Sequence, residues 1–219
     1  MGKLLKQAGI KFGILGAEES CCGDPARRLG NEYLFQIQAQ KNIELLKSYN
    51  VKKIVASCPH CYNSIKNEYP QFGGVFQVIH HTELIEELLR EGKLKITKGS
   101  KDRVTYHDAC YLGRYNSIFE TPRQILGNIP GITLVELARN RERGLCCGAG
   151  GGHLWLGEQR KGQRINEMRT EQAIEIEAQT IATACPYCLQ MFEDGIKTKA
   201  AEESLKVMDI AELVEKSIM

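Results

Sequence analysis

The sequence lacks three features that would assign it at once to a common class. No apolar run approaches the roughly 18 residues that a membrane-spanning helix needs, and the first residues contain neither a signal-peptide core nor a cleavage site. An excess of one charge is also missing, because 29 basic and 27 acidic residues leave a formal net charge of only +2. This balance gives no reason to expect a nucleic-acid partner. We therefore expect a cytoplasmic protein, membrane-associated only through a partner or a missing N-terminal region.

Cysteine, by contrast, is abundant, with nine residues in 219. A chain of this length can bury a core without disulfide bonds, and nothing in it indicates secretion. In a reducing compartment, clustered cysteines more often bind metal or carry redox chemistry. The composition therefore predicts a metal or redox site.

The cysteines repeat one pattern twice. Cys21-Cys22-Gly23 is followed, after 35 residues, by Cys58-Pro59-His60-Cys61. Cys146-Cys147-Gly148 is followed, after 37 residues, by Cys185-Pro186-Tyr187-Cys188. Corresponding positions lie about 125 residues apart, which indicates an internal duplication.

The second copy contains one further cysteine, Cys110, which precedes Cys146 by 35 intervening residues. Its counterpart in the first copy would fall about 15 residues before Met1. We therefore expect an incomplete first repeat over residues 1–98 and a complete second repeat over residues 99–219. The polar stretch Gly92–Ser100 is the predicted linker between them.

The hydrophobic pattern predicts an α/β fold in which each repeat has a small, mostly parallel sheet flanked by helices. The predicted strands are Phe12–Leu15, Lys53–Ala56, Phe76–Ile79, Val104–His107, Thr133–Leu137, Thr180–Ala184 and Leu205–Met208. The predicted helices cover residues 31–49, 60–68, 82–91, 121–128, 156–178, 187–195 and 210–218.

Each Cys-Pro-X-Cys segment follows a predicted strand and begins a predicted helix, which suits a metal site. Proline fits the first turn of a helix because its missing N–H has no intrahelical partner there. The free N–H groups and the helix dipole favour anionic sulfur. Both copies therefore offer a pair of thiolates at a helix N-terminus.

The Cys-Cys-Gly segments require a turn if both thiolates are to serve one site, and Gly23 and Gly148 allow it. The second copy then supplies five thiolates, more than a tetrahedral zinc ion or an ordinary cubane cluster takes. That surplus predicts an unusual iron–sulfur centre. Its predicted ligands are Cys110, Cys146, Cys147, Cys185 and Cys188. A cluster, a zinc ion or no metal at all remain alternatives for Cys21, Cys22, Cys58 and Cys61.

Other residues beside the cysteines are candidates for supporting roles. The loop Gly148–Gly152 is expected to approach the cluster, and His107 and His153 are the candidates for proton donation. A structural hydrogen bond is the alternative for both histidines, and His80 and His81 are expected to be structural. Arg27, Arg28 and Arg114 either balance the charge of a thiolate-bound cluster or face solvent. The arginines at 139, 141, 143, 160 and 164 are expected to face solvent or a partner.

The spacing Cys110-x35-Cys146-Cys147-Gly148-x36-Cys185-Pro186-Tyr187-Cys188 resembles the CCG, or cysteine-rich, domain. This family includes heterodisulfide reductase B. The segments Glu19–Gly30 and Tyr106–Tyr115 further resemble the C-terminal part of membrane-bound iron–sulfur oxidoreductases linked to electron-transfer flavoprotein. The resemblance covers almost the whole chain and implies a [4Fe-4S] cluster, non-cubane in heterodisulfide reductase B, for each complete motif.

The resemblance implies an oxidoreductase module that transfers electrons. The expected donor is a flavoprotein or a neighbouring iron–sulfur domain, and the expected acceptor is a quinone-reducing or disulfide-reducing partner. Direct disulfide reduction is a second hypothesis, and it would need a substrate cleft between the repeats. A zinc-stabilised interaction module without redox chemistry is a third hypothesis.

Overall fold

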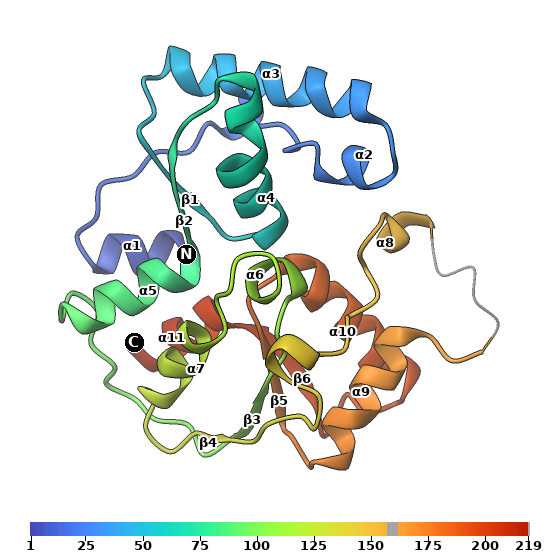
Figure 1. Ribbon diagram of the computed structural model, residues 1–219. Coiled ribbons are helices and arrows are strands. Elements are labelled where there is room, and N and C mark those ends of the chain that lie inside the picture. Colours follow the sequence, from blue (N-terminus) through green and yellow to red (C-terminus); the bar gives the residue numbers. More distant parts are fainter. Residues whose placement is uncertain (157–161, 219) are drawn as a thin grey trace.

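The apolar, β-branched runs of the second half form one parallel sheet. The computed structural model describes residues 1–156 and 162–218 (Figure 1). Its larger sheet has the order β4-β3-β5-β6, and all of its neighbouring strands are parallel. These strands are β3 (Arg103–Tyr106), β4 (Thr133–Leu134), β5 (Thr180–Thr183) and β6 (Lys206–Asp209). Every residue of the central strand β5 is buried, as expected for a strand covered on both faces.

The first half forms a smaller parallel sheet in which β1 (Lys53–Ala56) pairs with β2 (Gln77–His80). The register places Lys53 opposite Gln77 and Ala56 opposite His80. The two parallel sheets and their flanking helices confirm the predicted fold class. All but one of the predicted strands also appear, with boundaries that shift by at most three residues.

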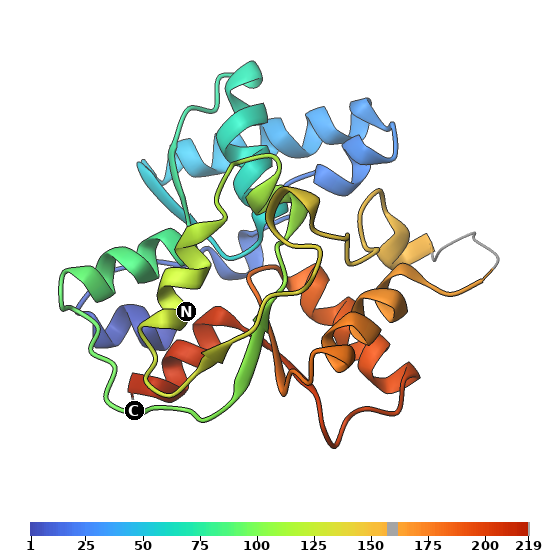
Figure 2. The same cartoon turned by 60° about the horizontal axis from the view of Figure 1, so that its bottom comes forward.

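Helices cover both sheets, and the two views show how they surround the strands (Figures 1 and 2). The first half contains α1 (Gly2–Gln7), α2 (Asp24–Arg28), α3 (Glu32–Ser48), α4 (Pro59–Asn63) and α5 (His81–Arg90). The short helices of this half are η1 (Gly16–Glu18), η2 (Ser64–Glu68) and η3 (Tyr69–Phe72). The second half contains α6 (Cys110–Gly113), α7 (Glu120–Gly127), η4 (Arg141–Arg143), α8 (His153–Leu156), α9 (Ile165–Glu175), α10 (Pro186–Thr198) and α11 (Ile210–Ile218).

The main hydrophobic core is shared by both halves of the chain. Leu4 of α1 and Ile85 of α5 belong to the same buried cluster as Val104 of β3 and Ile181 of β5. The N-terminal α1 also lies beside the C-terminal α11, where the Lys3 ammonium pairs with the Glu215 carboxylate at 2.5 Å. A smaller cluster, centred on Phe35 and Tyr69, packs α3 against η3. The division of the chain near residue 98 stays a prediction.

The predicted strand Phe12–Leu15 is wrong. These residues have no regular secondary structure, and Phe12 and Ile14 remain 43% and 78% exposed. The physical reason is the lack of a pairing neighbour. Its counterpart in the second half, β4, pairs with β3, but among the described residues β1 pairs only with β2. A strand cannot form where its backbone groups have no ladder to join.

The predicted helix 156–178 is too long. Leu156 ends the short α8, and residues 157–161, which include Arg160, lie outside the described part of the chain. The next helix, α9, starts only at Ile165, because Gly162 has a φ of +111° and Arg164 is extended. It ends at Glu175, shortly before Glu177 takes a positive φ. These backbone conformations interrupt a pattern that looks continuous in the sequence.

Candidate metal centre

The two Cys-Pro-X-Cys segments adopt the same local structure. Cys58 is the N-cap of α4 and Cys185 is the N-cap of α10, each with an extended backbone and proline in the first turn. Neither thiol makes a capping hydrogen bond with its own helix. Both sulfur atoms are therefore free to contact other groups.

The two Cys-Cys-Gly segments also share one geometry. Gly23 and Gly148 have φ values of +87° and +93°, which a glycine adopts without steric cost. The N–H of Gly23 lies 3.4 Å from Cys21 Sγ, and the N–H of Gly148 lies 3.3 Å from Cys146 Sγ. In both copies the turn brings adjacent thiols together, so that the paired cysteines interact with each other.

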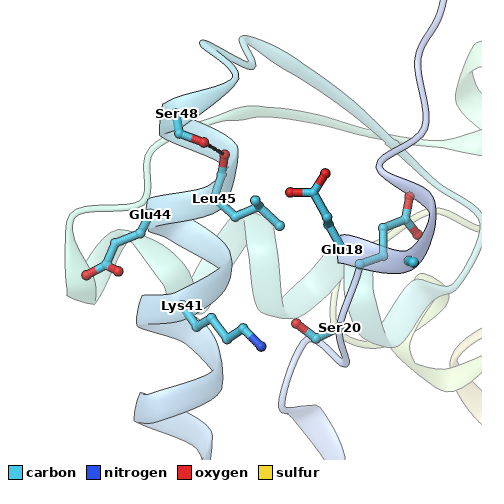
Figure 3. Close-up of a pocket in the computed structure, with 8 residues that line it drawn as sticks. Glu18, Ser20, Lys41, Glu44, Leu45 and Ser48 are labelled. Atoms are coloured by element: carbon cyan, nitrogen blue, oxygen red, sulfur yellow. Dashed lines mark hydrogen bonds between the residues drawn. The ribbon is translucent and has the colours of Figure 1, made fainter.

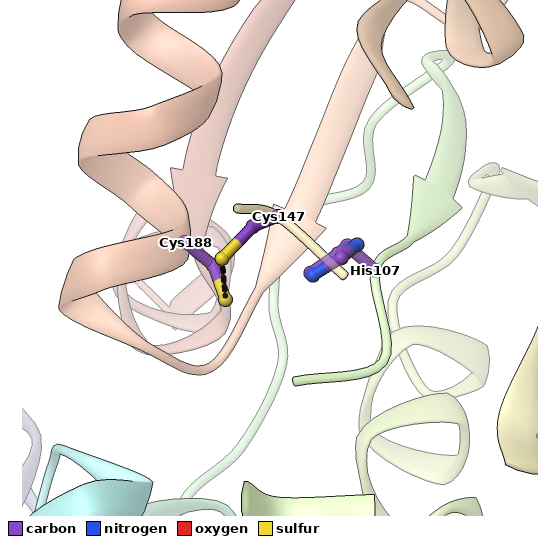
Figure 4. Close-up of side chains that lie close together, drawn as sticks. All are labelled: His107, Cys147 and Cys188. Atoms are coloured by element: carbon purple, nitrogen blue, oxygen red, sulfur yellow. Dashed lines mark hydrogen bonds between the residues drawn. The ribbon is translucent and has the colours of Figure 1, made fainter. Parts of the chain in front are cut away.

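The nine cysteines lie along one run of neighbouring thiols. None forms a disulfide. The sulfur atoms of Cys188 and Cys147 lie 3.3 Å apart, and Figure 4 shows the two side chains pointing toward each other. Interactions between neighbouring thiols continue this contact into one run through both copies, in the order Cys21, Cys22, Cys61, Cys58, Cys185, Cys188, Cys147, Cys146 and Cys110. The interaction between Cys58 and Cys185 joins the first motif (Cys21, Cys22, Cys58, Cys61) to the second motif (Cys110, Cys146, Cys147, Cys185, Cys188).

Hydrogen bonds along this run favour thiolates at three positions. Donation from Cys21 and then Cys61 lowers the pKa of Cys22 to about 4. Donation from Cys185 lowers the pKa of Cys58 to about 3. The pKa of Cys146 falls furthest, chiefly because Cys110 donates to it. Since the thiolate is the form that binds metal, the run is chemically suited to a thiophilic metal.

Burial differs along the run. Cys147, Cys185 and Cys188 are buried, which removes the centre of the run from solvent. Cys21, at one end, is exposed, and Cys110, at the other end, is half-buried. The site is therefore closed at its middle and open toward its ends.

The rings next to the cysteines stack across the junction between the two motifs. His60 and Tyr187 occupy equivalent positions in the two Cys-Pro-X-Cys segments, and their ring centroids lie 4.7 Å apart. His60 also stacks on Tyr111 at 4.0 Å, and Trp155 packs edge-on against Tyr187 at 5.5 Å. These contacts fix α4, α6 and α10 against one another at the cysteines.

The candidate histidines have different surroundings. A ring nitrogen of His107 and the sulfur atoms of Cys147 and Cys188 all lie within 4.8 Å of one another (Figure 4). His153 is exposed at the start of α8, and it does not belong to this group. His80 and His81 are buried, where His80 caps α5 and His81 lies 3.2 Å from Asp209. Their positions agree with the predicted structural roles.

The candidate arginines are engaged by protein groups. Arg28 donates to the Asp24 carboxylate at 2.9 Å, and Asp24 also contacts the His60 ring at 2.8 Å. Arg27 pairs with Glu68 at 2.9 Å. Arg114 donates to the carbonyl oxygen of Gly144. These arginines therefore brace the loops around the cysteines rather than pointing freely at a ligand.

Sequence reasoning missed two parts of the site. The first is the contact between the motifs, for which the duplication itself was the only signal. The second is Arg169, a fully buried arginine of α9 whose Nε lies 3.4 Å from His107 Nδ1. A single arginine within a helical pattern gives no sign that it turns inward.

The glycine-rich loop after the second Cys-Cys pair joins the two halves. A Cβ atom on Gly152 would lie 2.8 Å from Leu29, which follows α2 in the first half. Gly152 also has a φ of +81°. Glycine at this position therefore lets the loop pack against the first half, whereas Gly148 contacts Cys146.

A groove of about 530 Å³ lies between η1 and α3. Figure 3 shows Glu18 and Ser20 on one side and Lys41 and Glu44 on the helix opposite. Its lining contains acidic, basic and apolar side chains but no cysteine. We assign no chemistry to it.

Comparison with known proteins agrees with this geometry. The profile of the family described as "CCG: Cysteine-rich domain" matches residues 1–66 and 104–193. The chain belongs to this family. The matched segments contain all nine cysteines of the run, so the family assignment and the site rest on the same residues.

Curated relatives of this CCG-domain chain are iron–sulfur oxidoreductases. It is 51% identical over 217 residues to the probable iron-sulfur-binding oxidoreductase FadF of Bacillus subtilis and 48% identical over 222 residues to the EtfAB:quinone oxidoreductase of Syntrophomonas wolfei. It is 36% identical to one component of the dihydromethanophenazine:CoB–CoM heterodisulfide reductase of Methanosarcina barkeri. These alignments cover 99% of the chain but only 31%, 31% and 54% of the respective relatives. The chain thus spans a third to about half of their length.

Within residues 1–156 and 162–218, no helix combines the length and the apolar character needed to cross a membrane.

Proposed function

We propose that this CCG-domain chain is an electron-transfer module whose cysteines hold an iron–sulfur group. The observation that carries the proposal is the continuous run of nine thiols drawn from both motifs. Iron–sulfur clusters are held by cysteine thiolates. When bound, such a group supplies one-electron redox chemistry, while the protein sets its access and potential.

The donor set fits a polynuclear iron group better than zinc. A zinc ion takes four ligands in a closed tetrahedral site, but the second motif alone offers five thiols. We assign the second motif as the ligands of one [4Fe-4S] group, with a non-cubane form as the alternative to a cubane. The four thiols of the first motif are the proposed ligands of a second group, because four thiolates are the usual donor set of an iron–sulfur cluster.

The partners follow from the relatives. One relative is named as an oxidoreductase between EtfAB and quinone, so we propose a flavoprotein as the electron donor. A neighbouring iron–sulfur domain is the alternative donor. The proposed acceptor is a quinone-reducing or disulfide-reducing partner on the cytoplasmic side of a membrane. Quinone chemistry by these residues alone is not part of the proposal.

Direct disulfide reduction is the second candidate function. A heterodisulfide reductase component is among the relatives, and the run of thiols is exposed at Cys21. In this case His107 and His153 are the candidate proton donors. Reduced protein would then cleave a small disulfide, and it would do so without a flavoprotein or a quinone.

The test is anaerobic purification followed by iron and sulfide analysis and low-temperature electron paramagnetic resonance. We expect brown protein with both elements present. Cys147→Ser, at the buried centre of the second motif, should lose most of the iron, and Cys22→Ser should lose the part held by the first motif. Ser20→Ala, next to Cys21, is the matched control and should keep the iron content of the original protein. Colourless protein that contains zinc instead of iron would contradict the proposal.

A second assay separates the two functions. Protein reduced with an artificial donor is mixed either with a quinone-reducing partner or with a disulfide. Oxidation by the disulfide alone, with release of thiols, would favour the second function. Reoxidation only through the protein partner would favour electron transfer.

A further inference from the structure

Arg169 is a buried cation without a carboxylate partner. Its side chain is fully buried, and among the described residues no Asp or Glu lies within ion-pair distance of it. Nη1 donates to the Gln172 side chain at 2.8 Å, whereas Nη2 has no hydrogen-bond partner within that part of the chain. Buried charges in proteins are normally paired. The position of Arg169 therefore calls for negative charge from another source.

The acidic residue that acts most strongly on Arg169 is already engaged. Asp108 accepts two hydrogen bonds from Arg123, at 2.8 and 2.9 Å, and one from the backbone of Arg141 at 2.7 Å. Burial lowers the pKa of Arg169 to about 10, and the negative charge of Asp108 opposes that shift. Asp108 and the more weakly acting Glu136 are both bound to Arg123, so a negatively charged group held by the second motif would be the further anionic partner of Arg169.

Arg169 also determines which ring nitrogen of His107 carries the hydrogen. Its Nε lies 3.4 Å from His107 Nδ1. Because a guanidinium only donates, Nδ1 must accept, and the ring then carries its hydrogen on Nε2. Phe192 packs edge-on against the ring at 4.8 Å, and the backbone N–H of His107 donates to Ala182 at 2.8 Å. The ring is therefore held in both tautomer and orientation.

The ring of His107 also lies beside two sulfur atoms. One ring nitrogen of His107 lies within 4.8 Å of both Cys147 and Cys188 (Figure 4). Since Nδ1 is bound to Arg169, we take Nε2–H to be the group on the sulfur side. An N–H group and a cation so placed both favour added negative charge on a thiolate-bound group.

We propose that Arg169 is a positioning residue that raises the reduction potential of the iron–sulfur group held by the second motif, through its own charge and through the Nε2–H of His107. This inference rests on the proposed function. The mechanism is electrostatic. The reduced group carries one more negative charge than the oxidised one, so a buried cation and an N–H donor stabilise it selectively.

The first test is an anaerobic redox titration followed by electron paramagnetic resonance. Arg169→Gln removes the charge, and at a fixed potential the ratio of reduced to oxidised group should fall at least tenfold, which for one electron is a shift of 59 mV to lower potential. Arg169→Lys keeps the charge and should shift the ratio less. His107→Phe keeps the packing on Phe192 but removes the N–H, and should also lower the ratio. The matched control is Arg103→Gln, at the start of β3, which should leave the ratio unchanged.

The second test needs no metal. Nitrogen-15 resonances of His107 in the reduced, metal-free protein should report the Nε2–H tautomer in the original chain and a mixture of tautomers in Arg169→Gln. Thermal unfolding of the same metal-free variant checks that it folds.

The outcomes separate the two proposals. Original protein that binds no iron would refute the proposed function before any variant is compared. Iron-loaded Arg169→Gln with an unchanged ratio, or a His107 tautomer that does not respond to the substitution, would overturn only this inference. In a double-variant cycle, the shifts in reduction potential caused by Arg169→Gln and His107→Phe should add to less than their sum. The reason is that each substitution removes the same hydrogen bond.

Discussion

The buried ion pair between Arg123 and Asp108 gives the sharpest prediction about stability. Arg123 donates to both Asp108 oxygens, at 2.8 and 2.9 Å, and to Glu136 at 2.6 and 3.0 Å. The side chains of Arg123 and Asp108 are 5% and 3% exposed. Asp108 stands two residues before Cys110, and its carboxylate also accepts the backbone N–H of Arg141. The pair therefore ties α7 to two loops beside the cysteines.

We expect Arg123→Met to leave the Asp108 carboxylate buried and without its cation. Breaking a buried pair by removing one partner costs about 3–5 kcal/mol. For a chain of this size, each kcal/mol lowers the melting temperature by roughly 2–4 °C, so a decrease of about 6–20 °C is expected. Urea unfolding of the metal-free protein, followed by circular dichroism, measures the free energy, and thermal unfolding measures the temperature.

The control for this prediction is Arg90→Ala, which removes a solvent-exposed pair with Glu86 on α5. Exposed pairs contribute about 0–1 kcal/mol, so this variant should unfold almost like the original protein. The double variant Asp108→Ala, Arg123→Met should be less destabilised than Arg123→Met alone, because the buried Asp108 charge is removed together with its partner. Equal stability of Arg123→Met and Arg90→Ala would refute the reasoning.

Two further predictions concern the glycine turn and a buried histidine. Gly148→Ala places a side chain at a φ of +93° and should lower the free energy of unfolding by roughly 1–2 kcal/mol and reduce the iron content. Gly127→Ala, where no atom lies within 4 Å of a new Cβ, should do neither, and equal iron loss in the two would contradict the role of the turn. Burial, followed by the charge of His81, lowers the pKa of His80 well below its ordinary value of 6.5. The unfolded chain therefore binds the extra proton, and stability is lost as the pH falls below about 6.5. Urea unfolding at pH 7.5 and 5.5 measures this loss in the original protein and in His80→Asn. The free energy of unfolding should fall less in His80→Asn, by up to about 1.4 kcal/mol per pH unit below about 6.5. The same pH dependence in both proteins would exclude His80 as the cause.

The fold and the cysteine pattern were largely predictable because each depends on short-range rules. Strands such as Lys53–Ala56 follow from β-branched runs, and helices such as Glu32–Ser48 follow from apolar spacing. The turn at Gly148 follows from the need to bring two adjacent thiols to one side. All of these features are encoded within a few residues of one another.

The failures depend on partners that are distant in the sequence. The segment Phe12–Leu15 has a strand pattern, but among the described residues no strand lies beside it to complete a ladder. The interaction between Cys58 and Cys185 joins residues far apart in the chain, beside the ring contacts of His60 in α4 with Tyr111 in α6 and Tyr187 in α10. The inward turn of Arg169 likewise depends on His107, which belongs to another element. Local sequence patterns do not predict such contacts between distant residues.

The shared core has a consequence for how the two cysteine motifs stay together. Because α1 and α5 are buried with β3 and β5, the two halves of the chain are not independently folded units joined by a linker. A hinge motion that separated Cys58 from Cys185 would disrupt the hydrophobic core that the two halves share. The spacing of the sulfur atoms is thereby set by the cooperative folding of the chain, and a fragment beginning at residue 99 would expose the apolar surfaces that α1 and α5 now cover.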